Sequence, residues 1–288
     1  METSTNQPPV ILIDGSYYCF HRFHSLLTWW KNAHPEDTET LANPYTNETF
    51  VNKFRSTFVD NIHKIERHFN PKKKITNTNT NTNTNIHIKS QIIVGKDCKR
   101  EDIWRNNFIP QYKNTRKNDD RVKNFFKLVY TENLFQKAGA DTILEYPQLE
   151  ADDCIALYIR QQLILKDDSL RFIIITSDKD YLQLACPQVE IYNLSFKMLT
   201  EQKSSLGDAK CNLFCKIVMG DISDNIPSIF LKCGPKTALK YYNNDELFQK
   251  KLEEKEEYKV KYALNKLLVD FESIPQSIVD GFLHKYFL

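Results

Sequence analysis

The sequence predicts an α/β protein built on an open parallel sheet, and three observations carry this prediction. Short apolar runs at residues 10–13, 91–95 and 172–176 each lead into polar sequence, as buried strands do. The segments between them show apolar residues at helical spacing. Eight acidic residues stand at or just past the ends of the apolar runs: Asp14, Asp97, Glu150, Asp152, Asp153, Asp178, Asp180 and Asp221.

These acids predict metal-dependent phosphate chemistry. The loops beyond the carboxyl ends of parallel strands share one crevice, so acids placed there meet. Many carboxylates in one cleft repel one another, and divalent cations resolve the conflict. A set of ligands made only of oxygen favours Mg²⁺ or Mn²⁺ over zinc. Acids in the first turn of a helix can simply complement its dipole, but three within residues 150–153 exceed that need.

Length and composition bound the class of protein. A chain of 288 residues fits one large domain, or one domain with a smaller appendage. The net charge is only +2, yet residues 96–127 hold ten basic and five acidic residues. This excess beside an acidic site suits a polyanionic substrate, the alternative being a solvated helix face.

The compartment is also indicated by composition. Seven cysteines, an odd number without paired zinc-type spacing, predict free thiols in a reducing environment. No apolar run approaches the roughly 18 residues of a membrane span, and residues 1–9 lack the apolar core of a signal peptide. We expect a soluble intracellular protein that does not bind membranes.

The first half of the chain alternates strand, helices and an insertion. Residues 17–30 read as an aromatic-rich helix opened by Ser16 as its cap, and residues 51–69 as a helix that packs on the sheet. The Thr-Asn repeat at 76–85 has no apolar residue to bury, which predicts a solvated insertion. Residues 101–137 read as one or two helices whose apolar side is too sparse for a core.

The second half supplies more of the sheet and then becomes helical. We expect strands at 142–146 and 189–193, and a helix at 154–165 opened by the acids before it. From residue 211 short helices dominate, with a turn-rich connector at 219–227 and a helix at 236–242. Apolar positions near the C-terminus should return to the core. The predicted division is therefore a core at 1–205 and a second region at 206–288.

Seven ordered motifs give the chain a family resemblance. It resembles the flap endonucleases, specifically the bacteriophage and bacterial 5′ nucleases that include the N-terminal nuclease domain of bacterial DNA polymerase I. The motifs are Ile13-Asp14-Gly15-Ser16 with Phe20 and His24, Gly95-Lys96-Asp97 with Trp104-Arg105, Pro110 to Arg116, Glu150-Ala151-Asp152-Asp153, Ser177-Asp178-Lys179-Asp180, Gly220 to Pro227, and Gly234-Pro235-Lys236-Thr237-Ala238.

The resemblance implies a fold and a division of the acids. It implies a PIN-like nuclease core, a helical arch at about 98–137, and a C-terminal helix-three-turn-helix (helix-hairpin-helix) module that grips duplex DNA. Two Mg²⁺ ions are implied, for which Mn²⁺ can substitute. The resemblance implies that the first ion is bound by Asp14, Asp97, Glu150 and Asp152. The second is bound by Asp178, Asp180 and Asp221, and Asp153 lies between the two ions.

The resemblance also implies contacts with DNA. Lys113 and Arg116 fall where the arch of the family touches the scissile phosphate, and such charge-assisted contacts stabilise the transition state. Phe20 falls where an aromatic stacks on a terminal base, with plain core packing as the alternative. A basic partner in that helix is either His21 or Arg22. The other predicted DNA contacts are Arg105, Tyr112, Lys232, Gly234, Lys236 and Thr237.

One departure from the family pattern concerns the hairpin. Its turn normally carries two glycines whose backbone meets phosphate and a potassium ion, and here Lys232 stands at the first glycine position. Lysine adopts positive φ at a cost that glycine avoids, which bears on the K⁺ site. We expect Lys232 to replace part of the grip by contacting phosphate directly.

The predicted function is that of a metal-dependent 5′-3′ exonuclease and flap endonuclease acting on 5′ flaps, nicks, ends and RNA-primed duplexes in replication or repair. The alternatives are a PIN-type endoribonuclease, against which the hairpin module argues, and a non-catalytic junction binder, against which the complete set of acids argues. We expect a monomer at the site of DNA replication. Residues 276–283 are expected to pack on the core rather than bind a sliding clamp.

Overall fold

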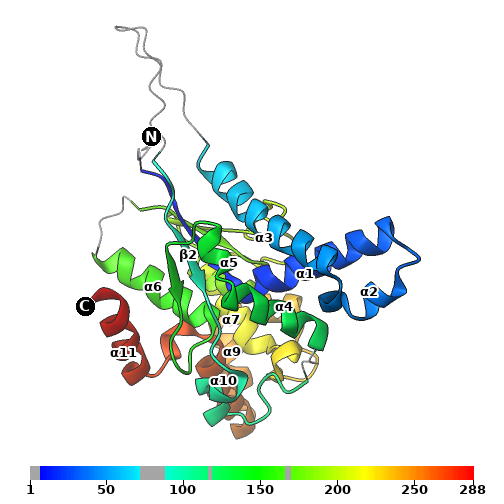
Figure 1. Ribbon diagram of the computed structural model, residues 1–288. Helices are drawn as coiled ribbons and strands as arrows, with labels where there is room; N and C mark the ends of the chain where they lie inside the picture. Colours follow the sequence, from blue (N-terminus) through cyan, green and yellow to red (C-terminus); the bar gives the residue numbers. More distant parts are fainter. Residues whose placement is uncertain (1–6, 72–87, 116–118, 166–169) are drawn as a thin grey trace, which may run out of the picture.

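The computed structural model describes residues 7–71, 88–115, 119–165 and 170–288 (Figure 1). The Thr-Asn repeat and Arg116 lie outside the described residues. Among the residues described, no helix combines the length and the apolar character needed to cross a membrane.

A five-stranded parallel sheet forms the centre, as predicted. The strands are β1 (Val10–Asp14), β2 (Ile92–Gly95), β3 (Thr142–Leu144), β4 (Phe172–Ile175) and β5 (Val189–Tyr192). Their order is β3-β2-β1-β4-β5 and every pairing is parallel. β1, β2 and β4 are buried along their whole length, which explains their continuous apolar sequence.

Helices and 3₁₀ turns connect and surround the strands. In chain order they are α1 (Gly15–Ala33), α2 (Thr38–Ala42), η1 (Pro44–Thr46), α3 (Glu48–Phe69), η2 (Arg100–Asp102), η3 (Trp104–Asn107), α4 (Asp120–Thr131), α5 (Leu134–Lys137), α6 (Ala151–Leu165), η4 (Lys179–Leu184), α7 (Ala209–Met219), η5 (Ile222–Asp224), α8 (Pro235–Tyr242), α9 (Asp245–Glu253), α10 (Glu256–Val269), η6 (Phe271–Ser273) and α11 (Gln276–Phe287).

The helices divide into three groups. α1, α3, α4 and α5 pack on one face of the sheet, and α6 and α11 pack on the other (Figure 1). α7 to α10 form a third apolar cluster with residues of the segment before α4 (Figure 1). In α11, Ile278 and Phe282 are buried in the sheet core, which confirms that this C-terminal helix packs on the core.

Helix α1 begins two residues earlier than predicted, because Asp14 caps it. The Asp14 carboxylate accepts a hydrogen bond from the Tyr17 amide at 3.0 Å. The prediction of Ser16 as the cap is therefore wrong. Ser16 instead donates its hydroxyl hydrogen to Asp97, so it links α1 to the end of β2.

Helix α4 belongs to the core, and the prediction of a sparse apolar side for this region is wrong. Phe125 is 1% exposed, and its ring lies 5.0 Å from that of Phe23 and 4.7 Å from that of Phe54. Residues 98–115 form only η2, η3 and turns among the described positions. The helical arch at 98–137 stays a prediction.

The C-terminal region contains two packed helices where the DNA-gripping module is expected. α7 and α8 pack together and are joined by residues 220–234, which contain η5 and a series of turns. Lys232 in this connection has φ +56°, the left-handed conformation that glycine would adopt without strain. That this region forms a DNA-gripping module stays a prediction.

Phe125→Ala should lower the free energy of unfolding by about 3–5 kcal/mol, because it leaves a cavity among aromatic side chains. The matched control is Phe20→Ala. Because Phe20 is 53% exposed, this substitution should lower the free energy of unfolding by about 0.5 kcal/mol or less. Urea denaturation monitored by circular dichroism measures both. Equal losses in the two variants would contradict the packing of α4 described above.

Candidate active site at the carboxyl edge of the sheet

Two acids at the ends of β1 and β2 are fixed by neighbouring elements. Asp14 accepts a hydrogen bond from the Thr176 hydroxyl at 3.1 Å, which ties the end of β1 to the end of β4. Asp97 accepts one from the Ala151 amide at 2.7 Å, which ties the end of β2 to the start of α6. These bonds bring three strand ends and one helix start to one place.

The first turn of α6 adds the next acids. Glu150, Asp152 and Asp153 have carboxylate oxygens that lie within 4.8 Å of one another. Asp152 Oδ1 accepts a hydrogen bond from the Asp153 amide at 2.8 Å. This part of the chain therefore meets the geometric requirement for a cation site made of oxygen ligands.

Arg105 lies inside the protein beneath these acids. Its guanidinium makes a bidentate pair with Asp153, with both distances 2.7 Å, and a third bond of 3.0 Å to Glu150 Oε2. Its Nε donates to the Leu268 carbonyl at 2.7 Å, and the side chain is only 3% exposed. The sequence motifs predicted that Arg105 contacts DNA. Its side chain instead lies in the interior, where it stabilises the buried carboxylates of Asp153 and Glu150.

Asp153 differs from the other predicted ligands because its oxygens are already occupied. Besides Arg105, Asp153 Oδ2 accepts hydrogen bonds from Trp104 Nε1 at 3.1 Å and from the Glu150 amide at 3.2 Å. The residue is completely buried. Its role as a metal ligand stays a prediction, and its contacts favour a supporting role.

The remaining acids follow β4 and α7. Asp178 caps η4 by accepting a bond from the Asp180 amide at 3.0 Å. Lys216 pairs with Asp180 and, at 2.7 Å, with Asp221 Oδ2. The carboxylates of Asp180 and Asp221 therefore meet at one ammonium group.

The two halves of the site differ in their electrostatics. Burial, followed by the charge of Asp97, raises the pKa of Asp14 to about 7. Burial and neighbouring carboxylates also raise the pKa values of Asp97 and Asp152. Burial acts to raise the pKa of Asp221 as well, but the charge of Lys216 outweighs it and holds that pKa at about 2. In the first half, Lys113 and Arg105 pair with Glu150, and burial outweighs the charge of Lys113 at Asp97 and the charges of both at Asp152.

The carboxylates of the first half also act on a buried tyrosine hydroxyl. Tyr181 is completely buried, and its hydroxyl has no hydrogen-bond partner among the described residues. Its pKa is raised by burial and then by the charges of Asp14 and Asp152. The carboxylates at this end of the sheet raise one another's pKa values, and a donor set made of carboxylate oxygens suits a divalent metal ion.

Lys113 and Asp224 belong to the same site. Lys113 Nζ lies 2.5 Å from Glu150 Oε1 and 3.7 Å from Asp224 Oδ2. Burial acts to raise the pKa of Glu150, but the charges of Lys113 and Arg105 hold it at about 2. Asp224, which is 4% exposed and stands three residues after Asp221, was not among the predicted site residues. This spacing within one polar turn was the available signal.

The predicted DNA contacts are distributed over several surfaces. Phe20 is exposed, which excludes core packing and leaves stacking on a base as its prediction. Arg22 is half-buried with its Nε unpartnered among the described residues, and His21 bonds Ser25 at 3.2 Å. The choice between His21 and Arg22 stays open. Tyr112 is buried and donates to Glu150 at 3.0 Å, so it supports the acids from below.

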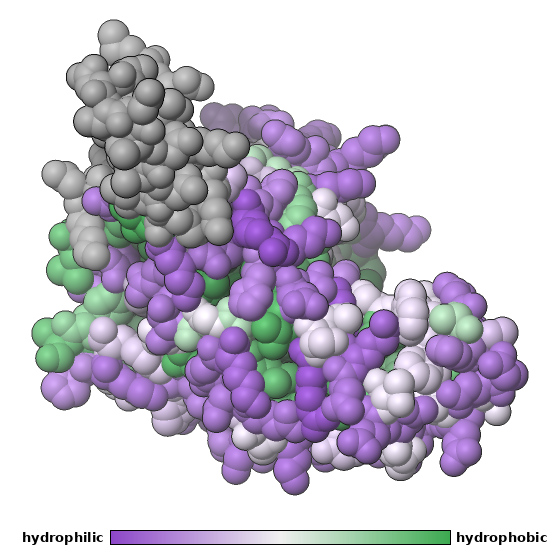
Figure 2. All heavy atoms as spheres, turned by 45° about the horizontal axis from the view of Figure 1, so that its top comes forward, coloured by the Kyte–Doolittle hydropathy of each residue, from purple (hydrophilic) through white to green (hydrophobic). Residues whose placement is uncertain are grey.

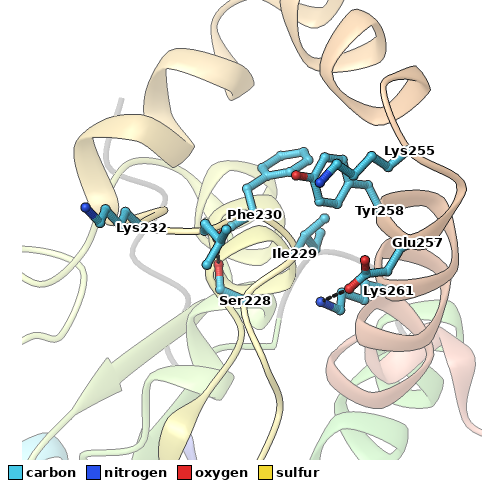
Figure 3. A pocket seen from close by; sticks show the side chains of 9 residues that line it. Ser228, Ile229, Phe230, Lys232, Lys255, Glu257, Tyr258 and Lys261 are labelled. Carbon is cyan, nitrogen blue, oxygen red and sulfur yellow. Dashed lines mark hydrogen bonds and ion pairs between the residues drawn. The ribbon is translucent and has the colours of Figure 1, made fainter.

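The hairpin residues lie apart from the acids. Lys232 and Lys236 are exposed, whereas Gly234 and Thr237 are partly exposed. A pocket of about 340 Å³ is lined in part by Lys232, Lys255 and Lys261, and Figure 3 shows Lys232 on the side opposite the other two lysines. The contact of Lys232 with DNA stays a prediction.

The surface and the interior differ clearly in character. Figure 2 shows a mainly hydrophilic face on which apolar side chains gather in limited areas. Part of the charge of the site is the exception, because Asp14, Arg105, Glu150 and Asp153 are buried at the end of the sheet, whereas Asp178 is exposed. This concentration of buried charge is typical of a functional site.

Comparison with known proteins identifies the family. A family model described as the 5′-3′ exonuclease N-terminal resolvase-like domain matches residues 9–211. The chain belongs to this 5′-3′ exonuclease family. The family resemblance found in the sequence motifs is thereby confirmed.

Relatives and solved structures agree with this family. The chain is 26% identical over 218 residues to a ribonuclease H of Enterobacteria phage T4, covering 68% of this chain and 70% of the relative. It is 24% identical to a 5′-3′ exonuclease of Buchnera aphidicola, covering 85% and 77%.

Solved bacteriophage T5 proteins share the fold. One was co-crystallised with metal ions and matches with a TM-score of 0.62 and 17% identity over 96% of this chain and 97% of its own. Another is a flap endonuclease variant in complex with DNA and metal ions, with a TM-score of 0.61 over the same shares and at the same identity.

Arg105→Ala should lower the free energy of unfolding of this exonuclease by about 3–5 kcal/mol, because it leaves Asp153 charged and unpaired in the interior. The control is Arg55→Ala. Arg55 pairs with Glu132 at a site about one-third exposed, so its loss should lower the free energy of unfolding by about 1 kcal/mol or less. Denaturant unfolding measures both. A stable Arg105→Ala protein that only binds DNA weakly would restore Arg105 as a DNA contact.

Proposed function

We propose that this protein is a Mg²⁺-dependent 5′-3′ exonuclease and flap endonuclease that hydrolyses DNA phosphodiesters. The observation that carries the proposal is a set of contacts beyond the ends of the strands, in a chain of the 5′-3′ exonuclease family. These contacts link Asp97 to the start of α6, Asp14 through Thr176 to Asp178, and Asp180 through Lys216 to Asp221. The acids fit divalent metal ions, and the T5 relatives were crystallised with metal ions.

The acids divide between two ions in this proposal. Asp14, Asp97, Glu150 and Asp152 would hold the first ion, and Asp178, Asp180 and Asp221 the second. When bound, two such ions activate a water molecule and neutralise the leaving oxygen, so no side-chain nucleophile is needed. Asp153 supports the first group through its pair with Arg105. Mn²⁺ can substitute for Mg²⁺ because both accept carboxylate oxygens.

The basic residues would place the substrate. Lys113 has φ +56° and its ammonium lies 2.5 Å from Glu150 Oε1, which supports its proposed role of contacting a scissile phosphate bound at the acids. Arg116 would add a second charge there. Phe20, one of His21 and Arg22, and the hairpin residues Lys232, Gly234, Lys236 and Thr237 would bind the ends and the duplex. A K⁺ ion at the turn would have to accommodate Lys232.

The substrate class follows from this arrangement. DNA with 5′ flaps, nicks or ends is the proposed substrate, and the products carry 5′-phosphate and 3′-hydroxyl groups. The T4 relative named ribonuclease H favours RNA-primed duplexes as a second substrate. Such a protein would remove primers and flaps as a monomer during replication or repair. A panel of flap, nicked, single-stranded and RNA-primed duplexes, cut in Mg²⁺ and in EDTA, tests the proposal.

Asp178→Asn should reduce flap cleavage in Mg²⁺ by more than about a hundredfold, because it removes a ligand charge on which transition-state stabilisation depends. Asparagine still caps η4, so the fold should be retained. Affinity for flap DNA in Ca²⁺ should stay equal or rise, since one repulsion with phosphate is lost. Cleavage rate and fluorescence anisotropy measure the two effects.

The control for this experiment is Asp60→Asn, which removes an exposed acid on α3 and should leave both quantities unchanged. Near-parental cleavage by Asp178→Asn would sink the assignment of two ions.

Lys113→Ala should slow single-turnover cleavage far more than it weakens DNA binding, because Lys113 lies among the acids rather than on the outer surface. Lys123→Ala on the exposed side of α4 is the matched loss of a positive charge and should leave the single-turnover rate nearly unchanged. Rapid-quench kinetics and anisotropy separate the two effects. A variant with a normal rate and poor affinity would count against the placement of Lys113 at the scissile phosphate.

A further inference from the structure

Lys216 occupies the place between two acids of the second group. Its ammonium contacts Asp180 Oδ1 and lies 2.7 Å from Asp221 Oδ2. The three side chains are between 15% and 22% exposed, so water screens the group only in part. One positive charge therefore already stands where the two carboxylates converge.

The fold directs Lys216 to this position. α7 ends at Gly220, whose φ of +70° turns the chain back; a Cβ there would meet the Ile226 carbonyl oxygen at 2.5 Å. Asp221 then lies beside Lys216, which is five residues earlier in the last turn of α7. Ser223 holds the other Asp221 oxygen with its amide at 2.8 Å and its hydroxyl at 2.6 Å. The Asp221 carboxylate is thus fixed with one oxygen facing Lys216.

The first group has a different balance of charge. Its one ion-paired member among the described residues is Glu150, which contacts Lys113 and Arg105 on its own two oxygens. Asp14, Asp97 and Asp152 form no ion pair with a lysine or arginine in the described parts of the chain. A divalent ion can approach these three carboxylates without displacing a cation. An ion at Asp180 and Asp221 must compete with Lys216 for the same oxygens, and two cations at that separation repel.

We propose that Lys216 is a positioning residue that acts as a built-in cation of the second metal site. In the free protein it keeps Asp180 and Asp221 together and makes the second divalent ion bind much more weakly than the first. Occupation of the second site requires the Lys216 ammonium to leave both carboxylates. This inference rests on the two-ion assignment of the proposed function.

The test is a titration of the metal-free protein with Mn²⁺ in the absence of DNA, in which electron paramagnetic resonance measures the free Mn²⁺. The parent should show one tight and one weak class of sites. Lys216→Met should tighten the weak class by roughly tenfold, the change given by about 1.4 kcal/mol, and leave the tight class unchanged. Lys216→Arg keeps the charge and should restore the parental pattern.

A second readout is thermal unfolding in EDTA and in Mn²⁺. Lys216→Met should unfold at a lower temperature than the parent in EDTA, because Asp180 and Asp221 then repel each other without a compensating charge. Its melting temperature should rise more than that of the parent when Mn²⁺ is added. Lys251→Met removes a comparable lysine from the exposed pair with Glu254 and should change neither Mn²⁺ class.

The outcomes separate this inference from the proposed function. Two classes with parental affinities in a folded Lys216→Met protein would overturn the role of Lys216 alone, as would two equally tight ions in the parent. A parent that binds no divalent ion and cuts no flap in Mg²⁺ would overturn the proposed function as well.

Discussion

Repulsion between buried carboxylates is the constraint on which much of this structure depends. Acids gather where the strands end, and the chain compensates their charge by different means. Arg105 lies beneath Glu150 and Asp153 as a fully buried counter-charge. Lys113 and Lys216 approach the same cluster from the segment before α4 and from α7. The packing of the C-terminal helices against the sheet is thus tied to the charge balance of the site, and not only to apolar contact.

The strands and most of the acids could be predicted from sequence because their signals are local. A continuous apolar run followed by an acid, as at Asp14, indicates both that a strand is buried and where it ends. A parallel sheet then brings such ends together whatever their order in the chain. Asp97 and Asp178 follow the same rule. The left-handed backbone conformation of Lys232 could also be predicted, because this lysine stands where the family pattern has a glycine.

What could not be predicted depends on partners far away in the sequence. Arg105 belongs to a basic segment, and nothing local says that Asp153 will enclose its guanidinium in the interior. Phe125 stands in the same segment, where charged neighbours conceal an apolar stripe that meets α1 and α3. Asp224 was overlooked since polar turns are rich in acids for ordinary reasons. Its burial beside Lys113 is set by tertiary packing.

The central place of β1 has a consequence for how the chain reaches its native state. β1 is hydrogen-bonded on one side to β2 and on the other to β4, so this strand is flanked by strands that are synthesised much later. Ile11 pairs with Ile92 and also lies opposite Ile173. A nascent chain therefore holds an apolar segment without its second neighbour until most of the sequence has left the ribosome. Contacts of such wide sequence separation slow folding, and this segment would need protection from aggregation in the interval.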